Sequence, residues 1–118
     1  MHPLYDEAND VVEKLRVARL EVARLSAELA RAEYDLRLTQ ARVERKWIKK
    51  AGGEKALAPT VEDRARILLV ALDADEEYKA ALDRRDALAL RLEEARVEAD
   101  ALRNRLSVIL AAMQANEP

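Results

Sequence analysis

The sequence predicts an all-α protein, a long, coiled-coil-like antiparallel helical hairpin that is oligomeric. Ala, Leu, Glu, Arg and Lys make up well over half of its 118 residues, a composition typical of long helices. Apolar residues recur at alternating spacings of three and four along two stretches, as in coiled coils. The only two glycines, Gly52 and Gly53, lie between these stretches. We therefore expect one domain over residues 1–118, with helix 1 at about 4–50, a basic hinge at 42–59 and helix 2 at about 60–114.

One apolar line runs along the first stretch, uninterrupted by glycine or proline. Its members, which we call the seam of helix 1, are Leu4, Ala8, Val11, Leu15, Ala18, Val22, Leu25, Leu29, Ala32, Leu36, Thr39 and Val43. A seam of this kind packs against one partner helix. Because the connection between the two stretches is short, an antiparallel hairpin is the simplest way to supply that partner.

A second apolar line lies on the far face of helix 1. It consists of Leu20, Ala23, Ala27, Ala30, Tyr34, Leu38, Ala41 and Ile48. Helix propensity alone is enough to explain the alanines, but the larger side chains indicate a partner beyond the hairpin. A lone two-helix hairpin also buries little apolar surface, so we expect a homo-oligomer. The expected interface residues are Leu20, Ala27, Tyr34, Leu38 and Ile48.

Helix 2 is expected to begin after Thr60, a good N-cap with Asp63 three residues further on. The acidic residues 73–77 leave two alternatives open: a break near 73–76, where Asp73 caps a new helix, or a continuous helix with an acidic turn. The apolar line then continues through Tyr78, Ala81, Arg85, Leu88, Leu92, Ala95, Ala99, Leu102, Leu106, Ile109 and Met113. We expect Tyr78 to be buried and Arg85 to contact a carboxylate, since an unpaired buried cation is costly.

Residues 42–55 (RVERKWIKKAGGEK), which we call the basic stretch, carry six cationic and two acidic side chains. Their local charge is +4, whereas the whole chain has a net charge of −2. Repeated cationic charge favours phosphate binding because counterions are released, and the only Trp offers a stacking surface for unpaired bases. The expected nucleic-acid-binding residues are Arg42, Arg45, Lys46, Trp47, Lys49, Lys50 and Lys55.

The order of these features resembles that of small phage recombination mediator proteins of the UvsY type. The matching features are RVERKWIKK at the end of helix 1, a short turn, Thr60-Val61-Glu62, the acidic DADEEY at 73–78, and a heptad helix with ALRNRL at 101–106. The resemblance implies an oligomer that binds single-stranded DNA and helps to load a recombinase onto strands covered by single-strand-binding protein. It implies DNA contacts at Arg42, Arg45, Lys46, Lys49 and Lys50. Two features depart from the family pattern: the Gly52-Gly53 turn, and the unusually regular heptad spacing of the C-terminal half.

We expect no enzyme, because Ser26 and Ser107 have no Cys to accompany them and the single His is at position 2. No cofactor and no metal are expected. The longest apolar run, residues 67–72, is far shorter than the roughly 20 residues of a membrane span. The lack of Cys fits a reducing compartment. We therefore expect no membrane partner and a cytoplasmic location, in the host cytoplasm if the protein is phage-encoded.

Two functions remain open at this level. The first is an oligomeric accessory protein that binds single-stranded nucleic acid, DNA or RNA, by charge and stacking, as a recombination mediator does. The second is a coiled-coil structural or adaptor protein that binds only protein partners. In that case the lysines only complement the helix dipole, and Trp47 packs against the connection.

Overall fold

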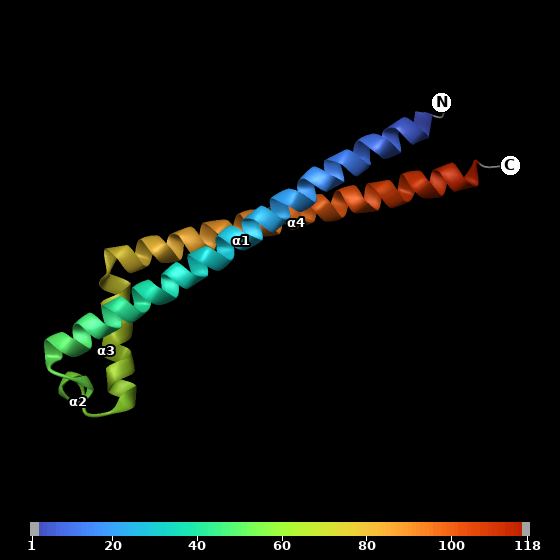
Figure 1. Cartoon of the computed structure of the whole chain (residues 1–118). Helices are drawn as coiled ribbons and strands as arrows, with labels where there is room; N and C mark the ends of the chain where they lie inside the picture. Colours follow the sequence, from blue (N-terminus) through green and yellow to red (C-terminus); the bar gives the residue numbers. More distant parts are fainter. Residues whose placement is uncertain (1–2, 117–118) are drawn as a thin grey trace. The chain divides into compact units, whose positions relative to one another are not determined.

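The computed structural model describes residues 3–116 (Figure 1). Within this range the chain forms α1 (Pro3–Ala51), α2 (Glu54–Leu57), α3 (Val61–Ala74) and α4 (Glu76–Ala115). No strand occurs among the described residues, and the predicted all-α class is confirmed. The predicted helix 2 is divided into α3 and α4.

Two glycines end α1. Gly52 and Gly53 have φ angles of 96° and 126°, a region that residues with a Cβ atom rarely adopt. The Gly53 amide donates to the carbonyl of Ile48 at 2.9 Å, which satisfies one of the last carbonyls of the helix. The short helix α2 follows, where the sequence predicted only an irregular connection.

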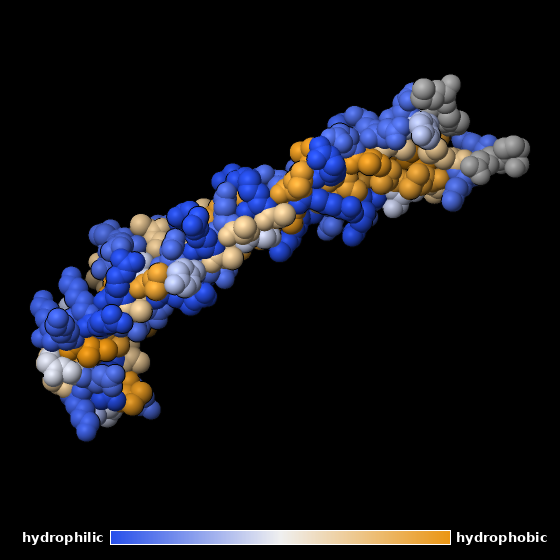
Figure 2. Space-filling view, viewed as in Figure 1, coloured by the Kyte–Doolittle hydropathy of each residue, from blue (hydrophilic) through white to orange (hydrophobic). Residues whose placement is uncertain are grey.

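The chain forms two compact units. Unit 1 comprises residues 1–28 and 89–118, and unit 2 comprises residues 29–88. In unit 1 the α1 and α4 segments run antiparallel, and Arg105 of α4 donates to Glu7 of α1 at 3.2 Å. Apolar side chains gather between the two segments (Figure 2). Ala8, Val11 and Ile109 form the buried cluster there, and Leu4, Leu102, Leu106 and Met113 pack against it.

Unit 2 packs the second half of α1 against α3 and the beginning of α4. Val43, Ala71 and Leu72 form its buried cluster, and Tyr78 packs against them. In the connection before α3, Ala58 is also buried. Its carbonyl accepts a hydrogen bond from Arg64 Nη1 at 3.3 Å.

The chain breaks between α3 and α4 at Asp75, whose backbone is extended (φ −85°, ψ 121°). Of the two alternatives for residues 73–76, the structure shows the break. The expectation that Asp73 caps the new helix is wrong, because α3 continues through Asp73 to Ala74. Asp75 caps α4 instead: the Tyr78 amide donates to Asp75 Oδ1 at 2.8 Å.

The N-cap of α3 is the one that the sequence predicted. The Asp63 amide donates to Thr60 Oγ1 at 3.1 Å. The backbone of Thr60 is extended (φ −115°, ψ 155°), as is typical of an N-cap residue.

Every member of the seam of helix 1 is buried or half-buried, as predicted. Its polar member, Thr39, is buried, and its hydroxyl donates to the carbonyl of Asp35 at 2.8 Å, so its burial is satisfied within the helix. On helix 2, Tyr78 is half-buried. Arg85 is also half-buried, with Nε 2.8 Å from Asp86 Oδ1, which is the expected contact with a carboxylate.

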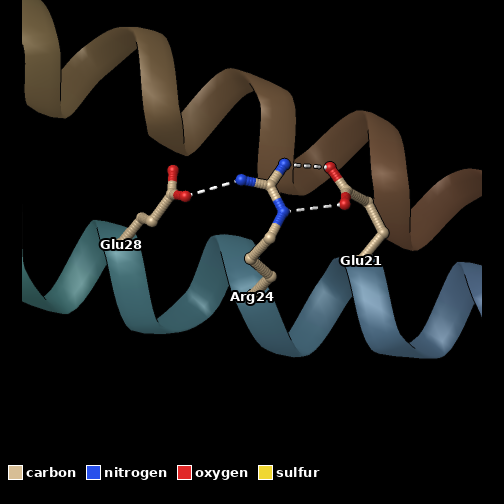
Figure 3. A network of polar contacts seen from close by, with 3 residues as sticks. All are labelled: Glu21, Arg24 and Glu28. Carbon is tan, nitrogen blue, oxygen red and sulfur yellow. Dashed lines mark hydrogen bonds and ion pairs between the residues drawn. The ribbon is translucent and has the colours of Figure 1, made fainter.

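An ion-pair network lies on the unit 1 part of α1 (Figure 3). Arg24 donates from Nε to Glu21 Oε2 at 2.9 Å and from Nη1 to Glu28 Oε1 at 2.6 Å. The hydrogen bonds from Arg24 lower the pKa of Glu21, and those from Arg16 lower the pKa of Glu13. These pairs are exposed to solvent, so each stabilises the helix only weakly.

The substitution Glu21→Gln should reduce the loss of stability in acid. A carboxyl whose pKa is lowered on folding stabilises the chain above its ordinary pKa of 4.5. This contribution is lost as the pH falls through the folded-state value. Urea unfolding in low salt should therefore show a smaller loss of stability for Glu21→Gln than for the wild type as the pH falls below 4.5. The control Glu93→Gln, at an exposed Glu of α4, should follow the wild type. Identical curves for all three proteins would contradict the pairing.

The substitution Asp75→Ala should cost about 1 kcal/mol in the free energy of unfolding, because it removes the cap of α4. Asp75→Asn should keep most of that stability, since Asn also caps well. The matched control is Asp73→Ala, which should cost nothing, because Asp73 lies at the negative end of α3. A larger loss for Asp73→Ala than for Asp75→Ala would overturn the assignment of the cap.

Candidate nucleic-acid interface

The basic stretch covers the last turns of α1, the Gly52-Gly53 turn and the beginning of α2, all within unit 2. Arg45, Lys46, Lys49 and Lys50 are exposed on α1, and Lys55 is exposed on α2. Spacings of three and four bring neighbouring cations on α1 together over a broad face. The structure therefore groups the predicted cations at one end of the long helix.

These cations differ in whether a carboxylate neutralises them. Arg42 Nη1 lies 3.6 Å from Glu77 Oε1 at the start of α4. Within residues 3–116, no ion pair involves the other five cations of the stretch. Glu44 accepts a hydrogen bond from Gln40 at 3.0 Å. Most of the positive charge of the basic stretch is thus available to an anionic ligand.

Trp47 is exposed in the last turns of α1. The side chain is 39% exposed, and Lys50 Nζ lies 5.6 Å from the centroid of the ring, within the range of a cation–π contact. A base that stacks on this face has to displace the ammonium group.

An apolar groove runs beside Trp47 in unit 2. It is lined by Trp47, Arg66, Ile67, Val70, Ala71 and Ala74. The α3 residues were not among the expected site residues, because their position beside Trp47 depends on how the connection folds back onto α1. The apolar run at 67–72 was the available signal, since it holds more apolar residues than one buried helix face needs.

The residues expected at an oligomer interface are largely uncovered in the single chain. Leu20 and Ala27 are exposed in unit 1, Tyr34 and Leu38 are exposed in unit 2, and Ile48 is half-buried. Their exposure leaves them available to a partner, and the oligomer stays a prediction.

The groups gathered in the basic stretch suit the binding of anions and of flat or apolar groups.

Among residues 3–116, no set of three or more acidic or histidine side chains is placed to hold a metal ion. In the same range, no helix has the length and apolar character that crossing a membrane requires. The expectation of a non-enzyme stays a prediction.

The substitution Trp47→Ala should lower the free energy of unfolding by about 1–3 kcal/mol, less than a fully buried aromatic side chain would cost. The reason is that the variant loses the apolar contact of the indole with the neighbouring α3 residues, among them Ile67 and Val70. The control Val61→Ala, at an exposed position that begins α3, should change stability by less than about 0.5 kcal/mol. Urea unfolding, followed by circular dichroism, measures the free energy of unfolding of both variants. An unchanged stability for Trp47→Ala would show that the indole does not pack on α3.

No family model matches the chain, and no curated protein or solved structure matches it either. The resemblance to phage recombination mediators therefore stays a prediction, and the function has to be inferred from the residues of this chain.

Proposed function

We propose that this protein is an oligomeric accessory protein that binds single-stranded nucleic acid through its basic stretch. The observation that carries the proposal is the set of exposed cations at the end of α1 that no carboxylate pairs within the described residues. They are Arg45, Lys46, Lys49, Lys50 and Lys55. Pairing with carboxylates would have indicated a structural role for these charges instead.

Binding by this surface is electrostatic and independent of base sequence. Each phosphate that a Lys or Arg contacts releases condensed counterions, so affinity falls as the salt concentration rises. Four of the five unpaired cations are lysines, whose long side chains make flexible point contacts and supply no fixed fork that would read base edges. The surface therefore suits a strand of any sequence.

Trp47 has a secondary role in the proposal. Stacking of one base on an aromatic ring contributes roughly 1–3 kcal/mol and does not depend on base identity. Lys50 Nζ lies 5.6 Å from the ring centroid, so a base that displaces it from the ring leaves the ammonium group beside the same nucleotide. The accessible part of the indole is the surface on which a base would stack.

Self-association would multiply the basic stretch. Several copies on one strand raise the effective concentration of each, so that weak individual contacts give a large avidity. The exposed far-face residues, among them Leu20, Tyr34 and Leu38, are the proposed contacts. The resemblance adds a recombinase and a single-strand-binding protein as partners and loading of the recombinase as the role.

A second candidate function is a protein adaptor. The observation in its favour is the apolar groove beside Trp47, where Ile67 and Val70 are exposed. An exposed apolar groove is typical of surfaces that bind protein segments. Salt-dependent binding to single-stranded oligonucleotides separates the two candidates, since only the first requires it.

Replacing Lys46, Lys49 and Lys50 together by Ala should weaken binding to labelled single-stranded oligonucleotides of every sequence alike. The dependence of log affinity on log salt should become shallower by about 0.7 for each phosphate that the variant no longer binds. Fluorescence anisotropy at several salt concentrations measures both quantities, on DNA and on RNA. In the matched control, Ala replaces three exposed cations of unit 2 outside the basic stretch, namely Arg31, Arg37 and Arg84. This variant should bind the oligonucleotides as the wild type does.

The substitution Trp47→Ala should behave differently in the same assay. It removes a stacking surface and no charge, so affinity should fall by roughly 1–3 kcal/mol while the salt dependence stays nearly constant. Helicity and oligomer mass must match the wild type before the result is interpreted. If the triple lysine variant binds as the wild type does and Trp47→Ala disrupts assembly, the basic stretch has a structural role and the adaptor is the better account.

A further inference from the structure

A second apolar line lies on α4, on the side away from the line that includes the buried residues Leu92 and Ile109. It begins at Leu90 and alternates spacings of four and three within unit 1. We call it the outer line of α4, and its members are Leu90, Glu94, Val97, Ala101, Asn104, Val108, Ala111 and Ala115. The spacing is that of a coiled-coil core, which indicates another helix as the partner.

The single chain leaves this line uncovered. Leu90, Val97 and Val108 are 62%, 60% and 69% exposed, and the alanines of the line are exposed as well. Three large apolar residues at core spacing on one exposed helix face are more than scattered surface residues explain. Alanines between them allow a second helix to approach closely.

The polar members of the line distinguish the possible orientations of a second copy. In a parallel pair in register, Glu94 would face Glu94 of the second copy inside the interface, and like charges there are costly. Glu93 and Glu98, which flank the line, would also face each other. Repulsion within the interface and repulsion at its edge therefore both disfavour a parallel pair.

An antiparallel pair removes both conflicts. With Val97 opposite Val108 of the second copy, Ala101 faces Asn104 and Glu94 faces Ala111. The flanking Glu98 then faces Arg105 of the second copy, and by symmetry this pair occurs twice. Arg105 already bonds Glu7 in its own chain, but a guanidinium has five N–H donors and can serve both carboxylates.

We propose that the outer line of α4 is an interface for a second copy of this chain, in antiparallel orientation with Val97 opposite Val108. Self-complementary charge identifies the occupant: Glu98 and Arg105 complement each other only when the same sequence lies opposite in reverse. The interface is separate from the far face of helix 1 and does not depend on nucleic-acid binding, so either proposal can fail while the other stands.

Single-cysteine variants of the full chain test the proposal, because the chain has no Cys of its own. Val97→Cys and Val108→Cys are each oxidised alone and as an equimolar mixture, with one variant tagged so that dimers differ in size. Because a disulfide needs Cα atoms within about 7 Å, we expect disulfide-linked mixed dimers in the mixture and no dimer from either variant alone. The control mixture pairs Val97→Cys with Val12→Cys, an exposed position on α1, and should not cross-link.

Each outcome decides the question. Mixed dimers in the first mixture alone support the proposed register. Dimers from Val97→Cys alone would show a parallel pair and overturn it. An absence of dimers, or equal dimers in the control, would overturn the interface altogether. Sedimentation of the double variant Val97→Glu/Val108→Glu provides the second readout. Loss of self-association relative to the wild type and to the control Val61→Glu, at an exposed position of unit 2, supports the interface, and an unchanged mass contradicts it.

Discussion

Burial of one narrow apolar seam is the constraint on which the rest of this structure depends. A helix as long as α1 is not stabilised by propensity alone and needs a partner along its length. The seam of helix 1 places an aliphatic side chain, or Thr39, at every turn, and these side chains are covered in both units. Helices that meet along such a line leave their remaining faces to solvent, so those faces carry any function.

The turn at the end of α1 converts this architecture into a candidate site. Gly52 and Gly53 stop the helix in conformations that other residues rarely adopt, and the cations of the last turns suit the negative end of the helix dipole. The helix dipole accounts only for cations in the last turn, and α1 carries further cations before it, at Arg42, Arg45 and Lys46. The same place therefore holds unpaired positive charge, an indole and the apolar side of α3.

Sequence reasoning was sufficient for whatever depends on local periodicity. The seams, the ending of α1 at its glycines and the Thr60 cap each follow from residues within a few positions of one another. Asp73 and Asp75 stand two residues apart in one acidic run, and only the observed end of α3 shows that Asp75 makes the cap. Local pattern cannot separate such neighbours.

The remaining features depend on how distant segments meet. The packing of Trp47 beside α3 requires the path of the connection, in which α2 was not predicted. The basic stretch was found because charge is visible in the sequence, whereas the apolar groove beside it was not. The outer line of α4 is readable in the sequence, but its exposure is evident only once the buried line of α4, which includes Ile109, has been placed against α1.

The most direct test of the central claim is the affinity of the unaltered protein for a single-stranded oligonucleotide as a function of salt. If the cations of the basic stretch bind phosphates, log affinity should fall linearly with log salt, with a slope of about −0.7 for each phosphate bound. Several bound phosphates should therefore give a steep line for every base sequence tested. No binding at low salt, or binding that does not change with salt, would contradict the account.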